Sequence, residues 1–151
     1  MLSRVAAQLY WLSRYLERAE NMARILEVGQ SFALLSSSQA DVEPNDAVSE
    51  PLVITDTLAA FEQTKRPMRA DQVAQFLAWD PSHPSSIVNC LKACRENARA
   101  VRGAMTGEMW ECINDTWLEL MARQKTHQGR ELPGDSGVFE WIKQQIGRAH
   151  V

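Results

Sequence analysis

One long stretch near the start of the chain, Ser3 to Leu35, constrains the fold more than any other feature. It contains no proline, and its first glycine is Gly29, so nothing interrupts a helix over most of its length. Apolar residues recur in it at alternating steps of four and three, which is the spacing of one helix face: Val5, Leu9, Leu12, Leu16, Ala19, Ala23 and Leu26. Trp11, Tyr15, Met22 and Ile25 widen that face. A helix with so broad an apolar arc packs against more than one neighbour.

Turn residues divide the rest of the chain into shorter helices. We expect the first helix to fray between Gly29 and Ser36, and the polar segment 36–46 to form a loop. Pro51 fits the first turn of a second helix, with Ser49 as its cap, and that helix should stop before Pro67. A third helix is expected over about 71–79, followed by a turn over 80–86.

Three more helices are expected in the second half. Serines at the end of the 80–86 turn are placed to cap a fourth helix, and Thr106 to cap a fifth. A polar loop over 126–134 precedes a short final helix, which Asp135 or Ser136 could cap. No segment alternates apolar and polar residues as a strand does. The predicted class is therefore all-α, an antiparallel helical bundle of about five to six helices, and we expect it to be incomplete.

Composition and charge narrow the class of protein. The 151 residues suffice for one domain, and 45% of them are hydrophobic. The net charge of -3 gives no general attraction to nucleic acid. No apolar run approaches the roughly 20 residues of a membrane span, and the start of the chain lacks the features of a secretory signal. The 3 cysteines are an odd number, which suits reduced thiols. We therefore expect a cytoplasmic protein that binds neither nucleic acid nor membranes.

The last six residues, 146–151, look different from the rest. They back-translate to a sequence that resembles the start of a common sequencing-library adapter. We therefore expect residues 1–145 to be natural and 146–151 to be a non-native tail, with a genuine frayed terminus as the alternative. In the first case the chain is a fragment.

The densest polar group lies on the first helix. It comprises Glu17, Arg18, Glu20, Asn21 and Arg24, with Arg14 one turn earlier. A second four-three row runs through it and comprises Tyr10, Arg14, Glu17, Asn21 and Arg24. A second group lies on the predicted fourth helix and comprises Arg95, Glu96, Asn97 and Arg99. These side chains could form a solvated face with weak ion pairs. They could also form interhelical pairs, such as Glu17 with an arginine and Arg18 with Glu108 or Glu111. A third interpretation is an arginine-lined groove for a carboxylate or phosphate.

Other chemistry finds little support in the sequence. The histidines, at 83, 127 and 150, form no Glu-x-x-His pair, and Cys90 and Cys94 lack further metal ligands nearby. Phosphate-binding glycine loops and nucleophile elbows are absent. We therefore expect no metal, no cofactor and no catalytic residues.

Residues 10–21, which read Tyr-Trp-Leu-Ser-Arg-Tyr-Leu-Glu-Arg-Ala-Glu-Asn, resemble the signature of the Alpha-E family. That family is described as a predicted α-helical domain with a conserved Glu-Arg motif, and Glu17-Arg18 stands in its place here. Residues 80–86, 95–99 and 108–111 are similar to further family blocks, although Ser13 replaces the usual glycine and His83 an expected asparagine. Family members are about twice as long, so the resemblance implies that this chain is an N-terminal half.

The resemblance also implies a function. Genes of the family cluster in bacteria with ATP-grasp ligases and transglutaminase-like peptidases, in the context of peptide synthesis or modification. The expected role is a non-catalytic partner of an ATP-grasp peptide ligase, which binds the enzyme or presents its substrate. One alternative is an enzyme acting on peptides or amino acids with Glu17 as base, but a carboxylate between arginines suits that role poorly. The other is a structural oligomerisation bundle, since an incomplete bundle favours self-association.

Overall fold

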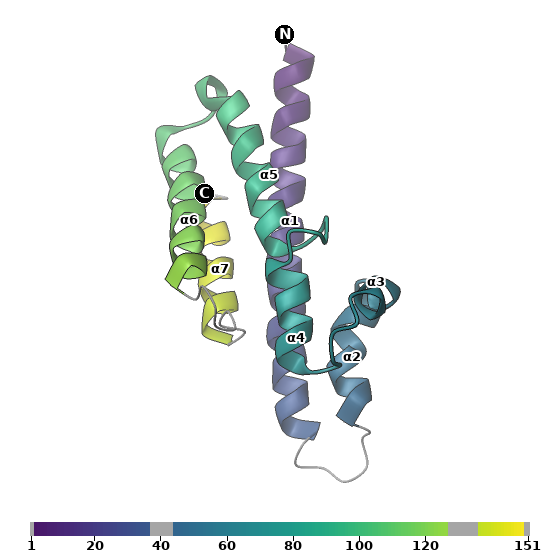
Figure 1. Ribbon diagram of the computed structural model, residues 1–151. Coiled ribbons are helices and arrows are strands. Elements are labelled where there is room, and N and C mark those ends of the chain that lie inside the picture. The colour runs from purple at the N-terminus through teal and green to yellow at the C-terminus, as the bar shows by residue number, and fades with distance from the viewer. Residues whose placement is uncertain (1, 37–43, 127–135, 150–151) are drawn as a thin grey trace.

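The computed structural model describes residues 2–36, 44–126 and 136–149, and all of its regular structure within these ranges is helical (Figure 1). The first helix, α1, spans Leu2–Ser36. It is the longest element, and α5, α7 and α2 all pack against it. The prediction of an all-α fold built around the first helix is confirmed.

Apart from α4, which packs against α1 and α2, the remaining α-helices form two groups around α1 (Figure 1). On one side lie α5, α6 and α7, and on the other lies the pair of α2 and α3. The bounds are α2 Pro44–Ile54, α3 Leu58–Gln63, α4 Ala70–Ala74, α5 Ile87–Ala100, α6 Gly107–Thr126 and α7 Ser136–Ala149. A π-helical turn, Gln75–Trp79, extends α4, and a 3₁₀ turn, Arg102–Ala104, follows α5. Neighbouring long helices run in opposite directions, as in a bundle.

The core forms along the predicted apolar face of α1. Leu12, Leu16, Ala19, Ala23 and Leu26 are all buried there. They pack in one cluster with apolar side chains of α5 and α7, among them Leu91, Cys94, Phe139 and Ile142. Trp11 lies at the edge of this face and is 47% exposed. The four-three spacing thus identified the buried face correctly, and of the residues expected to widen it Met22 is buried and Tyr15 packs against the core, whereas Trp11 is half exposed.

Both predicted caps in the second half are present. The Ser86 hydroxyl accepts a hydrogen bond of 3.3 Å from the Asn89 amide at the start of α5. The Thr106 hydroxyl accepts one of 3.2 Å from the Met109 amide at the start of α6. Each satisfies an amide that has no partner within the helix.

The prediction for the second helix is wrong in three respects. α2 begins at Pro44, so Pro51 lies in its interior, and the Ser49 hydroxyl donates to the Asp46 carbonyl at 3.2 Å and caps nothing. The helix then ends at Ile54, because Asp56 adopts a left-handed backbone conformation with φ of 54°, and α3 is a separate helix. α1 also continues past Gly29 to Ser36 without fraying. Of the two predicted loops, 36–46 and 126–134, residues 37–43 and 127–134 lie outside the described residues, and the rest is helical.

α7 continues through most of the last six residues. Ile146 and Ala149 are buried and belong to the core cluster. Whether residues 146–151 are natural stays a prediction, as does the incompleteness of the bundle. Among the described helices, none is both long and apolar enough to cross a membrane.

Candidate functional site

The central pair of the predicted polar row, Arg14 and Glu17, forms an ion pair along α1. Arg14 Nη1 donates to Glu17 Oε2 at 3.0 Å, and both side chains are about half exposed, at 51% and 50%. The pair joins residues three apart on one helix, and water screens it, so it contributes little to stability. The expected pairing of Glu17 with an arginine of α5 is wrong.

A groove of about 280 Å³ opens beside this pair, and we call it the polar groove. α1 contributes Arg14, Glu17, Arg18, Asn21, Met22 and Ile25 to its lining. Thr55, from the turn after α2, and Ser85, from the turn before α5, complete it. The groove therefore combines one face of α1 with two turns that are distant from it in sequence.

The electrostatics of the polar groove are set by Arg18. Its guanidinium carbon lies 5.9 Å from the centroid of the Tyr15 ring, and no carboxylate among the described residues pairs with it. Arg14 and Glu17 neutralise each other, so the lining carries one net positive charge. An exposed guanidinium beside amide and hydroxyl groups can bind a carboxylate or phosphate through two parallel hydrogen bonds.

The rest of the α1 row lies outside the polar groove. Arg24 donates to Glu20 one turn away, and Arg24 lies on the edge of a different, apolar groove between α1 and α2. Tyr10 is 58% exposed and packs edge-to-face on Trp11, with 5.4 Å between ring centroids. The polar residues predicted to act together on α1 therefore lie in three separate environments in the structure.

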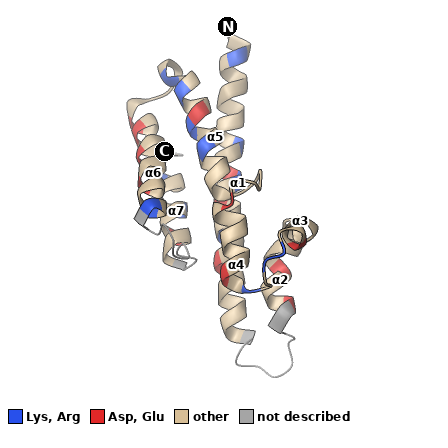
Figure 2. Ribbon diagram, viewed as in Figure 1, with Lys and Arg blue, Asp and Glu red and all other residues tan. Residues whose placement is uncertain are grey.

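The α5 group does not reach the polar groove either. Arg95 Nε donates to Asn114 Oδ1 of α6 at 3.0 Å, and Arg95 also pairs with Glu96 at 3.6 Å. Asn97 donates to the Ala93 carbonyl at 2.8 Å, and Arg99 is exposed. In Figure 2 the charged residues of α5 lie towards its C-terminal end. Arg95 therefore ties α5 to α6, whereas the interhelical pair considered from the sequence joined an arginine of this group to Glu17.

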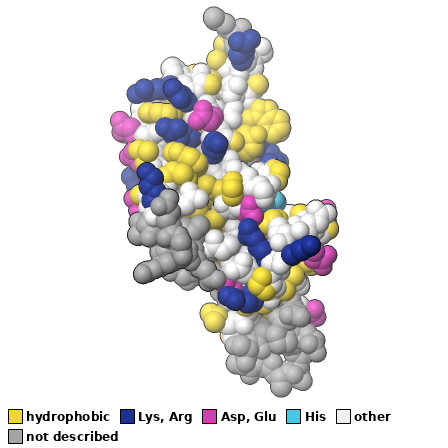
Figure 3. Space-filling view, viewed as in Figure 1, with side chains coloured by type: hydrophobic (Ala, Val, Ile, Leu, Met, Phe, Trp, Pro, Cys, Tyr) yellow, Lys and Arg dark blue, Asp and Glu magenta, His cyan; other side chains and the backbone are white. Residues whose placement is uncertain are grey.

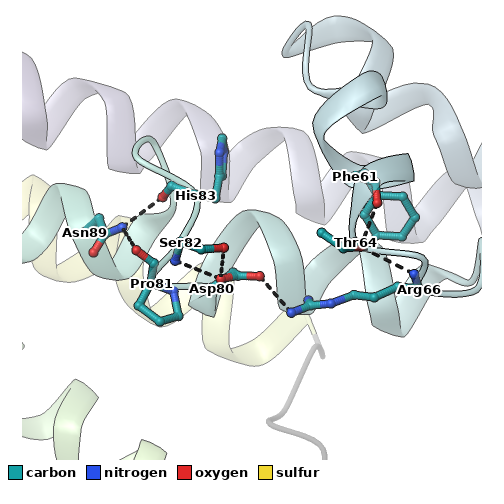
Figure 4. Close-up of polar contacts among 8 residues, drawn as sticks. All are labelled: Phe61, Thr64, Arg66, Asp80, Pro81, Ser82, His83 and Asn89. Atoms are coloured by element: carbon teal, nitrogen blue, oxygen red, sulfur yellow. Dashed lines mark hydrogen bonds and ion pairs between the residues drawn. The ribbon is translucent and has the colours of Figure 1, made fainter.

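A second polar cluster, which the sequence analysis missed, forms at the turn between α4 and α5 (Figure 4). Asp80 accepts hydrogen bonds from Arg66 Nη2 at 2.7 Å and from the Ser82 amide and hydroxyl at 2.8 and 2.6 Å. Asn89 Nδ2 donates to the carbonyls of Pro81 and His83 at 2.9 and 2.8 Å. These contacts fix the backbone that carries Ser85 into the polar groove.

Burial shapes the protonation of this turn. It raises the pKa of the Asp80 carboxyl, but the hydrogen bonds from Ser82 and the charges of Arg66 and His83 outweigh it and leave that pKa below its ordinary value. Burial lowers the pKa of His83, which stacks on Phe76 at 4.8 Å, although the Asp80 charge opposes the shift. His83 Nε2 and Trp79 Nε1 are buried without a hydrogen-bond partner among the described residues.

The cysteines are buried thiols. Burial raises the pKa of Cys90 to about 11 and that of Cys94 to about 12, so neither is a thiolate near neutral pH. Cys112 is partly buried, and its Sγ donates to the Gln145 carbonyl at 3.5 Å. Within the described ranges, no three His, Cys, Asp or Glu side chains are grouped so that they could hold a metal ion.

The fold and the site define a class of protein, an all-helical domain whose Glu17-Arg18 pair is exposed on its longest helix. The model of the Alpha-E family, a predicted alpha-helical domain with a conserved ER motif, matches residues 1–149, and the chain belongs to this family.

Two relatives carry no assigned function. An uncharacterised protein of Mycobacterium bovis is 29% identical over 143 residues, which cover 88% of this chain and 15% of that protein. An uncharacterised protein of Mycobacterium tuberculosis is 28% identical over the same length and coverage. The chain thus spans about 15% of the length of the curated relatives it matches. No solved structure matches it.

Proposed function

We propose that this chain is a non-catalytic binding module, and that its partner is an ATP-grasp peptide ligase in a system with a transglutaminase-like peptidase. The observation that carries the proposal is the exposure of Glu17 and Arg18, the pair at the family's Glu-Arg motif. Neither side chain is buried, and neither joins α1 to another helix through a described ion pair. A motif that the fold does not need is available to another molecule.

The polar groove suggests what that molecule presents. Arg18 supplies an unneutralised cation, and Ser85 lines the groove with a hydroxyl group, whereas the Thr55 hydroxyl already donates to the Pro51 carbonyl at 2.8 Å. This chemistry suits a carboxylate, either an acidic side chain of the ligase or the acidic end of its peptide substrate. Figure 3 shows basic, acidic and apolar side chains interspersed on one face of the molecule.

An enzyme that uses Glu17 as a general base is the second candidate, and the geometry favours it less. The Glu17 carboxylate is hydrogen-bonded to Arg14 and lies half in water. The polar groove is open, so its walls do not exclude water from a reacting group. Turnover of peptides by the purified protein, lost on Glu17→Gln, would reverse this order.

Co-purification with the ligase tests the proposal. Both proteins are expressed together, with an affinity tag on the ligase, and the amount of helical protein retained is measured. The double variant Glu17→Ala with Arg18→Ala should lose retention and keep its circular dichroism spectrum. The matched control, Glu119→Ala with Lys125→Ala, removes an exposed acid and base on α6 and should be retained normally. Loss of helicity in the first variant would instead make the motif structural.

A further inference from the structure

A second groove, larger than the polar groove, lies between the C-terminal third of α1 and α2, and we call it the apolar groove. Its volume is about 800 Å³. α1 lines it with Ile25, Val28, Gly29, Phe32 and Leu35, and α2 lines it with Ala47, Pro51 and Ile54. Arg24, Asp46 and Glu50 complete the lining and are its charged residues.

The walls of the apolar groove are unusually exposed for side chains of their type. Val28 is 52% exposed, Phe32 58%, Leu35 62% and Ile54 59%. They are not part of the core face of α1, which carries Ala23 and Leu26 and is fully buried. A contiguous apolar surface of this extent marks an interaction site in a soluble protein.

The shape of the groove fits a helix. Ile25, Val28, Phe32 and Leu35 follow steps of three, four and three, so they form one stripe about 15 Å long, or about three turns. α2 runs antiparallel to α1 and supplies the second wall (Figure 1). A helix satisfies its own backbone hydrogen bonds, so it can lie between two such walls without leaving polar groups unpaired.

The charged edges select the kind of helix. Asp46 and Glu50 lie four residues apart on α2, and neither pairs with a basic side chain among the described residues. Arg24, on the α1 edge, is already paired with Glu20. The α2 edge is therefore acidic and open to a basic ligand.

We propose that the apolar groove docks an amphipathic helix of a partner protein. That helix carries apolar residues at steps of three and four and Lys or Arg along the flank that lies over α2. The proposal concerns a different surface and a different ligand from the polar groove, so each can fail without the other.

Two synthetic peptides of about 14 residues test the proposal with the full chain. Both carry leucines at steps of three and four. One has lysines four residues apart on the flank, and the other has glutamates there. Binding is measured by fluorescence anisotropy. The lysine peptide should bind about tenfold tighter than the glutamate peptide, and salt should narrow the difference.

Variants locate the binding. Val28→Asp should abolish it, whereas Leu118→Asp, at a position 53% exposed on α6, should not. Glu50→Lys should remove or invert the preference for lysine, whereas Glu62→Lys, an exposed acid on α3, should leave it unchanged. Arg18→Ala should have no effect, which separates this test from that of the proposed function.

Three results would overturn the proposal: failure of both peptides to bind, equal affinity for the two, or binding that Val28→Asp does not change. Sedimentation analysis adds a fourth. If the chain is a dimer that Val28→Asp converts to monomer, the occupant of the groove is a second copy and no basic partner helix is needed.

Discussion

The Pro51 ring of α2 packs directly on the bare backbone of Gly29 in α1. A Cβ atom at position 29 would lie 2.7 Å from Pro51 Cγ, closer than carbon atoms can approach. Glycine in a helix interior costs about 1 kcal/mol relative to alanine, so helix preference does not explain the glycine at position 29. The pair instead allows α1 and α2 to pack closely, and both residues line the apolar groove.

Gly29→Ala should therefore destabilise the protein although alanine is the better helix former. We expect a loss of about 1–2 kcal/mol in the free energy of unfolding, because the rigid proline ring cannot move aside. Gly103→Ala is the control, since a Cβ there meets no atom within 4 Å. Urea denaturation measures both variants. A Gly29→Ala protein as stable as the parent would show that the two helices separate freely.

The Arg66–Asp80 pair should be worth more than exposed pairs. The Asp80 side chain is 7% exposed and that of Arg66 32%. Asp80→Ala leaves the partly buried arginine and the Ser82 groups without their acceptor and should cost about 2 kcal/mol. Arg69→Ala, which removes a more exposed pair with Asp71, should change stability by less than about 0.5 kcal/mol. Thermal unfolding of the two variants compares them, and equal effects would contradict this ranking.

His83 should make stability depend on pH. Its pKa is lowered in the folded state, so folding favours the neutral ring. That contribution is complete above the unfolded pKa of about 6.5 and is lost as pH falls through it towards the folded value. His83→Phe keeps the stacking on Phe76 and removes the buried, unpartnered Nε2.

The melting temperature of the parent should therefore fall between about pH 7 and pH 5.5, and that of His83→Phe should stay level. Asp80 stays charged in both states over this range, because its ordinary pKa is lower still. If the melting temperatures of the parent and His83→Phe depend on pH in the same way, protonation of His83 does not destabilise the folded state, and this prediction is wrong.

The three thiols should react at different rates. At about pH 8 the raised pKa values reduce the thiolate fraction of Cys90 on the order of a hundredfold, and that of Cys94 on the order of a thousandfold, below that of an ordinary cysteine. An aromatic disulfide reagent should label Cys112 first and the other two only on unfolding. Cys112→Ser should remove the fast phase. Rapid labelling of all three in the native protein would contradict the burial of Cys90 and Cys94.

The sequence predicted the helices best where one apolar face decides the packing. The face that carries Leu12, Leu16 and Ala19 is buried because a four-three repeat places apolar side chains along one side of the helix, where exposure to water is unfavourable. The prediction for the second helix was wrong because it placed Pro51 in the first turn from the local preference of proline alone. In the structure Pro51 packs on Gly29, which is distant in sequence, and short-range patterns do not contain that contact.

The site was predicted in part for a similar reason. Spacing shows that Arg14, Glu17 and Arg18 lie close together on one helix, and the structure places all three at the polar groove. Spacing does not show which neighbour a face meets. Arg95 was therefore grouped with α1 but contacts Asn114 of α6. Thr55 and Ser85 reach the groove from turns, and no motif marked them. The Asp80-Pro81 block was noted only as a resemblance, without its contact to Arg66.

The most direct test of the central claim is the dissociation constant between this chain and the ATP-grasp ligase, measured by isothermal titration calorimetry. Arg18→Glu replaces the unneutralised cation of the polar groove with an anion while leaving the Arg14–Glu17 pair in place. The account predicts at least about tenfold weaker binding and a smaller dependence on salt. The same dissociation constant for the parent and Arg18→Glu, or no measurable binding of the parent, would contradict it.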